Sequence, residues 1–211
     1  MNKKTIKILL LLVVVVVAYG IFRYVFFEPS GYLATWIRIG QHTRTVVTKR
    51  AFASSIPFTG ALGGIAGGDQ KCTMFATNAG LGGQWMAWLS TGNSNARDRI
   101  PDVKYKRVDG VMIAMNKADL VDGTIDNTLN VDEHGVVVRA HIPPNHYAWT
   151  GTHENGLWTG SGTDCNGWTS ASSAVLGQQG HVHTTNAWSA TFPATCDHSD
   201  SAGGLLYCFE L

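Results

Sequence analysis

The N-terminal part of the chain places three lysines before a long apolar run. The lysines lie within residues 1–7, the run extends from Ile8 to Phe22, and apolar residues continue beyond Arg23 to Phe27. A basic segment before an apolar one keeps the N-terminus in the cytoplasm and directs the following chain across the membrane. The pattern therefore predicts that the remainder of the protein is exported.

Two forms of this segment, residues 1–27, fit the pattern. Ala18-Tyr19-Gly20 resembles the small-residue cleavage site of a secretory signal peptide, which would leave a secreted protein. Residues 8–27 are instead long enough to span roughly 30 Å of hydrocarbon as an uncleaved signal-anchor helix. Because apolar residues continue past the candidate cleavage site, the sequence favours a membrane anchor at residues 8–27 and a cell-surface location.

Beyond the anchor, the apolar positions predict one helix. The residues that would form its buried face share a helical spacing, and they are Ile65, Cys72, Phe75, Ala76 and Ala79. Gly80 is expected to end this helix. The segment before it, residues 28–50, contains a Pro-Ser-Gly break and reads as a juxtamembrane linker, so we expect the globular domain to cover residues 51–211.

The other apolar stretches of the domain are short. They predict strands at residues 52–54, 83–90, 110–115 and 135–142, and a closing strand in the segment LLYCFEL. Gly, Asn and Asp punctuate the long connections at 91–135 and 143–190. One early helix with dispersed strands predicts a loop-rich α+β domain.

Charge is distributed unevenly along the chain. Residues 1–50 carry a net +7 and residues 51–211 a net −6, which together give the +1 of the whole chain. An acidic domain is poorly suited to nucleic acid, because phosphate contacts need clustered positive charge. We therefore expect no nucleic-acid partner. The basic N-terminal part is explained by topology and by attraction to anionic lipids.

The four cysteines all lie in the part that is predicted to be exported: Cys72, Cys165, Cys196 and Cys208. An even number of cysteines in an oxidising compartment indicates two disulfides, and four cysteines allow three connectivities. No pair has the C-x-x-C spacing of zinc ribbons or thioredoxin-like sites. The cysteines are thus expected to be structural.

The segment TGALGGIAGGDQKC raises the possibility of a phosphate-binding loop. Its glycines, Gly63, Gly64, Gly67 and Gly68, lie at the start of the predicted helix. A P-loop requires Gly-Lys-Ser/Thr after the glycines, whereas here Asp69 follows and its carboxylate would repel a phosphate. We expect a structural turn, with Asp69 near the first helical turn accepting backbone N–H groups.

Other candidate chemistry is weak. His181 and His183 have a spacing that places both imidazoles on one side of a strand, and Asp119 and Asp122 lie in an oxygen-rich segment, residues 118–135. Neither pattern has the ligand spacing of an established metal site, so no metal or cofactor is predicted. No G-x-S-x-G elbow occurs and the cysteines are expected to be oxidised, so we expect a non-enzymatic protein.

Several motifs together resemble a known family. They are FASSIPFTGALGGIAGGDQKC, AGLGGQWMAWLS, ADLVDGTI, AWTGTHENG, DCNGWTS and LLYCFEL. In order and spacing they resemble an uncharacterised bacterial family of exported proteins, of the DUF1554 type. That family is similar in turn to the endostatin domain, a variant of the C-type lectin-like fold. The resemblance covers about residues 51–211 and implies the pairs Cys72–Cys208 and Cys165–Cys196.

The departures from that resemblance limit what it implies about binding. The Glu-Pro-Asn or Gln-Pro-Asp loop and the Trp-Asn-Asp strand of calcium-dependent lectins are absent, as are the basic heparin surface and the N-terminal zinc histidines of endostatin. The resemblance therefore implies the fold and the disulfides without their binding sites. The function expected is recognition or adhesion at the bacterial surface, with an extracellular protein or glycan bound by the long loops. The alternative is a structural subunit of the cell envelope that self-associates.

Overall fold

The computed structural model describes residues 14–18, 47–138, 147–197 and 203–211. Residues 14–18 are helical, whereas the rest of the predicted segment at 8–27 and the chain up to residue 46 lie outside the described residues. Within the described part, no helix is both long enough and apolar enough to cross a membrane. The signal peptide or anchor therefore stays a prediction.

Helix α3 (Gly64–Asn78) is the one predicted helix, and it lies within one residue of the predicted bounds. It buries Cys72, Phe75 and Ala76 on the expected face, together with Gly68. Gly80, with φ 71°, ends the helix as predicted, because the next N–H, that of Leu81, donates back to the carbonyl of Ala76 at 2.8 Å. A left-handed glycine with this back-bonding is a common way to satisfy the last helical carbonyls.

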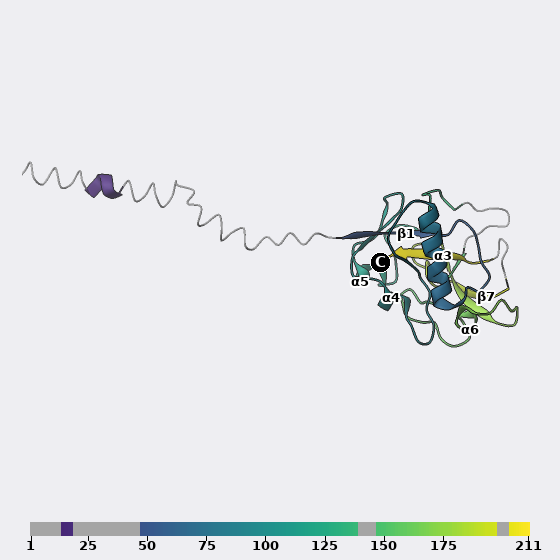
Figure 1. Ribbon diagram of the computed structural model, residues 1–211. Coiled ribbons are helices and arrows are strands. Elements are labelled where there is room, and N and C mark those ends of the chain that lie inside the picture. Colours follow the sequence, from purple (N-terminus) through teal and green to yellow (C-terminus); the bar gives the residue numbers. More distant parts are fainter. Residues whose placement is uncertain (1–13, 19–46, 139–146, 198–202) are drawn as a thin grey trace, which may run out of the picture. The chain divides into compact units, whose positions relative to one another are not determined.

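Eight strands form a single sheet, and with α3 they make the mixed α+β fold that the sequence predicts. The strands are β1 (Thr48–Ala53), β2 (Trp85–Ala87), β3 (Lys104–Arg107), β4 (Met112–Ala114), β5 (Tyr147–Trp149), β6 (Leu176–His181), β7 (Phe192–Thr195) and β8 (Leu205–Glu210). Their order is β4-β3-β1-β8-β5-β6-β7, with β2 also paired to β8. Figure 1 shows α3 in front of the sheet, where it packs against β2 and β8.

Strand β8 organises the sheet because it pairs along both edges. On one edge it is antiparallel to β1, and on the other it is antiparallel to β2 and parallel to β5. Its residues from Leu205 to Phe209 are completely buried. The first and last strands of the domain are therefore neighbours in its core.

A charged cluster joins the outer ends of β1 and β8. The Arg50 side chain and backbone N–H both donate to one carboxylate oxygen of Glu210, at 2.8 and 3.2 Å. Burial raises the pKa of Glu210, but the hydrogen bonds and charge of Arg50 outweigh it, so the pKa lies below its ordinary value. This pairing fastens the C-terminus to the first strand of the domain.

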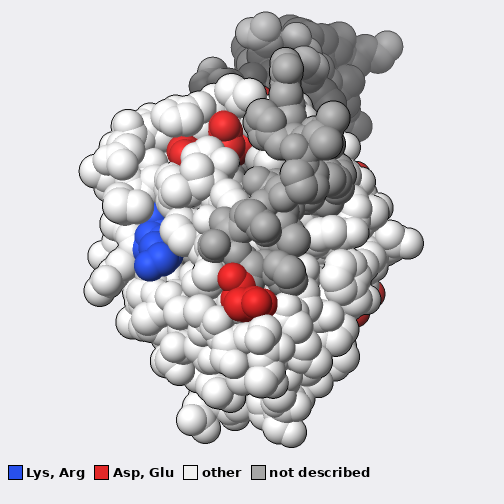
Figure 2. Space-filling view, turned by 90° about the vertical axis from the view of Figure 1, so that its right-hand side faces the viewer, with Lys and Arg blue, Asp and Glu red and all other residues white. Residues whose placement is uncertain are grey.

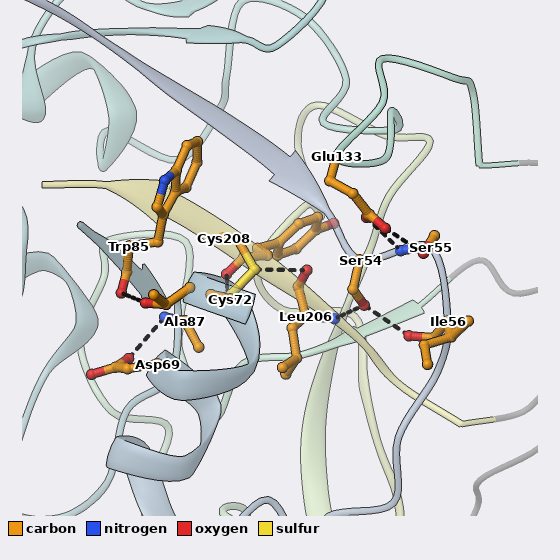
Figure 3. Close-up of a disulfide and its surroundings, with 12 residues drawn as sticks. Ser54, Ser55, Ile56, Asp69, Cys72, Trp85, Ala87, Glu133, Leu206 and Cys208 are labelled. Atoms are coloured by element: carbon orange, nitrogen blue, oxygen red, sulfur yellow. Dashed lines mark hydrogen bonds between the residues drawn. A yellow bond between two sulfur atoms is a disulfide. The ribbon is translucent and has the colours of Figure 1, made fainter. Parts of the chain in front are cut away.

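Both disulfides are present, and they are the pairs that the family resemblance implies. Cys72–Cys208 ties α3 to β8, as Figure 3 shows, and Cys165–Cys196 links two segments 31 residues apart. All four cysteines are completely buried. Among the tryptophans of the domain, Trp88, Trp149, Trp168 and Trp188 are completely buried, Trp85 is nearly so, and Trp158 is half-buried.

Three short helical turns complete the domain: α4 (Ala96–Arg99), α5 (Lys117–Leu120) and α6 (Cys165–Trp168). The last is a turn of left-handed helix, since φ is positive at all four of its residues. The side chain of Asp164 accepts the N–H of Gly167 at 3.1 Å, and the Trp168 indole donates to the carbonyl of Ser90 at 2.9 Å. The Trp168 carbonyl accepts the N–H groups of Leu62 and Gly63, and Asp164 bridges to Gly177, so the turn is held between β6 and the start of α3.

Several predicted boundaries are wrong by a few residues. Regular structure begins before residue 51, because β1 starts at Thr48 and residues 48–51 already pair with β3. The strands predicted at 83–90 and 110–115 shorten to three residues each. The strand predicted at 135–142 is reduced, over its described residues, to an isolated bridge between Val131 and Val137, and residues 139–142 lie outside the described part.

Candidate functional site

The glycine-rich segment at the start of α3 serves the fold. The four glycines in question are Gly63, Gly64, Gly67 and Gly68. The first two have φ of 88° and 76°, which favours glycine. A β-carbon on the third would lie 2.1 Å from the carbonyl oxygen of Leu62, and one on the fourth would lie 2.7 Å from the Leu89 side chain. Two positions thus need the backbone freedom of glycine and two need its small size.

The prediction that Asp69 caps the start of α3 is wrong. No acidic residue lies in the first turn of α3, and the Asp69 carboxylate instead accepts the backbone N–H of Ala87 at 2.9 Å. Its other oxygen pairs with Arg99, whose guanidinium also donates to the carbonyl of Ala87 at 3.1 Å. The pair therefore satisfies the outward backbone groups of β2, as Figure 3 shows for Asp69. The reason is register: Asp69 lies more than one turn into the helix, beyond reach of its free N–H groups.

The weak metal candidates are engaged in local hydrogen bonds. The backbone N–H of His183 donates to Nδ1 of His181 at 3.1 Å. The Asp119 carboxylate accepts the backbone N–H of Met115, and the Asp122 carboxylate accepts the backbone N–H of residue 124. In the same acidic segment, Glu133 is buried and its carboxylate accepts both the N–H and the hydroxyl of residue 55 (Figure 3). Over the described ranges, no three His, Cys, Asp or Glu side chains are grouped as a metal site would require.

A surface pocket of about 350 Å³ lies between the two short helices α4 and α5. It is lined by Arg97, Asp98, Asp102, Lys117, Ala118 and Val121. The Asp102 carboxylate accepts the N–H of Lys117 at 2.9 Å and so joins the two helical turns. Asn116 caps α5 by accepting the N–H of Asp119, also at 2.9 Å. The pocket is of the size at which proteins begin to bind small ligands or single side chains.

The long connection at residues 143–190 contacts this pocket through Arg97. The Arg97 guanidinium donates to the carbonyl of Asn155, and the Arg97 N–H donates to that of Gly156, both at 3.3 Å. A β-carbon at Gly156 would lie 2.5 Å from that of Arg97, so glycine permits the contact. The predicted loops 91–135 and 143–190 therefore meet at Arg97.

The pocket offers both signs of charge over a small apolar floor. Arg97 and Asp98 approach to 3.6 Å with side chains 38% and 62% exposed, a spacing at which an ion pair in water contributes little. Among the described residues, Lys117 forms no ion pair. The lining contains no Ser, Thr, Cys or His side chain. It is suited to binding charged or polar groups by hydrogen bonds and ion pairs.

The sequence pattern of one family, described as "Protein of unknown function (DUF1554)", matches residues 55–185, more than half of the chain. The chain belongs to the DUF1554 family. The match includes α3, the pocket between α4 and α5, and the left-handed turn α6. The DUF1554 match ends before Cys196 and Cys208, although each is bonded to a cysteine within it. No curated protein matches the chain.

The pocket was not foreseen from the sequence. Residues 91–135 read as loops and short strands, and α4 and α5 are each only four residues long, too short for a hydrophobic period. A local signal was present in Asn116, which precedes Asp119 by three residues in a capping pattern. The Asn166-Gly167 pair likewise marks the left-handed turn, because both residues tolerate positive φ better than others.

Proposed function

We propose that this DUF1554 protein is a non-enzymatic recognition module that binds an extracellular protein or glycan through its two long connections. The observation that carries the proposal is the pocket at Arg97, where both connections meet on a scaffold held by two disulfides. Binding surfaces are often built from loops on a rigid framework. A pocket with both signs of charge, formed where two long connections meet, is suited to recognition of charged or polar groups.

We also propose that the domain is an endostatin-type variant of the C-type lectin-like fold. The antiparallel pairing of β1 with β8 supports this, because it joins the two ends of the domain and leaves the long connections on one scaffold. The disulfide from the single long helix to the last strand is the pair that the resemblance implies, and it supports the same assignment.

Export to the bacterial surface is part of the proposal. Buried disulfides with no free cysteine are typical of proteins that fold in oxidising compartments. The basic and apolar pattern of residues 1–27 adds the route, either as a cleaved signal peptide or as an anchor at residues 8–27. N-terminal sequencing of the mature protein distinguishes these two forms.

The test is a binding screen with a charge reversal in the pocket. The full chain, with disulfides intact, is applied to arrays of extracellular proteins and glycans. We expect saturable binding that Lys117→Glu weakens at least tenfold, while Lys106→Glu, the same change on β3 outside the pocket, leaves it intact. Binding that both variants retain unchanged would show that the pocket is not the site. Crosslinking in intact cells that yields only homo-oligomers, with no binding on any array, would favour the envelope-subunit alternative instead.

A further inference from the structure

A long segment in the C-terminal third of the chain is almost free of charge. No lysine or arginine follows Arg139, and residues 155–196 contain a single acidic residue, Asp164. That carboxylate accepts the N–H of Gly167, and Asp164 is only 9% exposed. The segment 155–196, called here the uncharged segment, therefore presents essentially no charge to solvent.

The uncharged segment forms a continuous part of the surface. It contains α6, β6 and β7, and the side of the domain that carries α6 and β7 faces the viewer in Figure 2. The lower part of that view shows none of the colour of Lys, Arg, Asp or Glu. An ordinary soluble surface consists of about a quarter to a third charged residues, so this one is exceptional.

Short polar side chains take the place of the charges. The exposed residues of the segment include Ser161, Thr169, Ser172, Ser173 and Thr191. Such side chains donate and accept hydrogen bonds, yet they lose less rotamer freedom on binding than Lys, Arg, Gln or Glu would. A surface of this kind can be covered by a polar ligand at a low entropic cost, and no charge has to be desolvated.

Aromatic rings gather where β5, β6 and β7 lie side by side. Tyr147 on β5 contacts Phe192 on β7 edge-on at a centroid distance of 4.8 Å, and it contacts His181 on β6 at 5.1 Å. Phe192 is 40% exposed, so part of its ring faces solvent. The rings lie on one face of the sheet, because Tyr147 is directly opposite His181 in the register.

A buried donor lies on the same face. Gln179 is paired with Phe192 across β6 and β7 and precedes His181 by two residues, so the register places all three side chains together. Gln179 is only 1% exposed, and its amide nitrogen donates no hydrogen bond. Buried donors without partners are rare in folded proteins, and an ordered water or ion is one established explanation for them.

We propose that this surface, formed by the β5–β7 aromatic rings and the uncharged segment beside them, binds an uncharged polysaccharide. The ring of Phe192 stacks on the C–H face of a sugar, and the exposed hydroxyl groups of the uncharged segment exchange hydrogen bonds with its hydroxyls. The inference rests on the proposed recognition function and adds to it a second binding surface, apart from the pocket at Arg97.

A second copy of the chain is a poorer occupant. A stable protein interface buries about 800 Å² per partner around an apolar centre. The uncharged segment exposes two large apolar side chains, Leu176 and Phe192, and the register places them on opposite faces of the β6–β7 pair. The apolar area on either face is therefore too small to form such a centre, whereas a sugar chain needs one ring and many hydrogen bonds.

The test is a titration of the full chain with laminarin, dextran and mannan, with heparin as the charged comparison. We expect saturable binding of at least one neutral polysaccharide, with a Kd that changes less than twofold between low and high salt because no ion pairs form. Phe192→Ala should raise that Kd about tenfold, the loss expected for one stacking contact. Met74→Ala, which removes a similarly exposed apolar side chain from α3, should leave it unchanged.

The outcomes separate the two proposals. Neutral polysaccharides that do not bind, or that bind equally well to Phe192→Ala, overturn this inference. A dimer in the ultracentrifuge that Phe192→Ala dissociates also overturns it and identifies the surface as a contact between copies. If a ligand binds through Lys117 while no polysaccharide binds, the recognition function stands without this inference, and binding of neither overturns both. Melting curves of each variant verify that it is folded.

Discussion

The left-handed turn α6 allows the energetics of this scaffold to be tested at one exposed position. The φ values at Cys165, Asn166, Gly167 and Trp168 are 50°, 55°, 67° and 66°. The two outer side chains are buried, one in a disulfide and one against Ser90. Asn166 is exposed and its side chain makes no hydrogen bond within the described residues, so substituting it changes the backbone preference and little else.

The expected magnitudes follow from that backbone preference. A residue with a β-carbon costs about 1–2 kcal/mol in the left-handed region, and asparagine costs less than most. Asn166→Ala should therefore reduce the free energy of unfolding by about 1 kcal/mol, and the β-branched Asn166→Val by about 2 kcal/mol. Asn166→Gly should lie within about 0.5 kcal/mol of the natural protein, because its relief of strain is offset by the greater freedom of an unfolded glycine.

The assay is urea unfolding with both disulfides oxidised, supported by thermal melting. For a domain of this size, 1 kcal/mol corresponds to about 2–4 °C in Tm. Asn186, which is exposed and has no positive φ, provides the matched control, and Asn186→Ala and Asn186→Val should each change stability by less than about 0.5 kcal/mol. Equal costs for valine at Asn166 and at Asn186 would refute the reasoning from left-handed strain.

Three further predictions concern the scaffold. Gly60→Ala should destabilise the domain by at least about 2 kcal/mol and leave free thiols in an Ellman assay, because the new β-carbon would lie 2.2 Å from Sγ of Cys165. Asp69→Ala should cost about 2 kcal/mol in urea unfolding, and Asp69→Asn less, because only the alanine leaves the buried N–H of Ala87 without an acceptor. The pKa of Glu210 is lower in the folded protein than in the unfolded one, so the Glu210 carboxylate stabilises the fold at neutral pH. This stabilisation is lost as the pH falls through the folded pKa. Between pH 7 and pH 3, the Glu210→Gln variant should therefore lose less stability than the natural protein.

Helix α3 was predictable because its signals are local. Its apolar spacing spans four turns, and Gly80 stops it through a backbone conformation that glycine adopts most readily. The short strands were less predictable. The predicted strand at 83–90 keeps only Trp85–Ala87 as regular structure, although Trp88 and Leu89 are equally buried. Burial set the apolar pattern there, whereas the strand ends where its pairing with β8 ends.

The candidate site was less predictable still, because it depends on contacts between distant parts of the chain. The pocket depends on the hydrogen bond from Arg97 to Asn155, which lies 58 residues later. The sequence around either residue contains no signal that predicts this contact. Asp69 illustrates the same limit. A carboxylate near a helix start suggests a cap, yet its partners Ala87 and Arg99 are 18 and 30 residues away. Local rules assign local partners, and tertiary structure can provide better ones.

The two proposed binding surfaces differ in the physical force that each would use. The pocket offers Arg97 and Lys117 at an exposed surface, where salt at 0.1 M screens charges beyond about 10 Å. The β5–β7 surface offers a ring and hydroxyls with no charge, so its interactions are insensitive to salt. A ligand whose affinity falls with salt and with Lys117→Glu therefore belongs to the pocket. A ligand whose affinity is independent of salt but falls with Phe192→Ala belongs to the uncharged surface. A ligand whose affinity falls with salt, with Lys117→Glu and with Phe192→Ala contacts both surfaces.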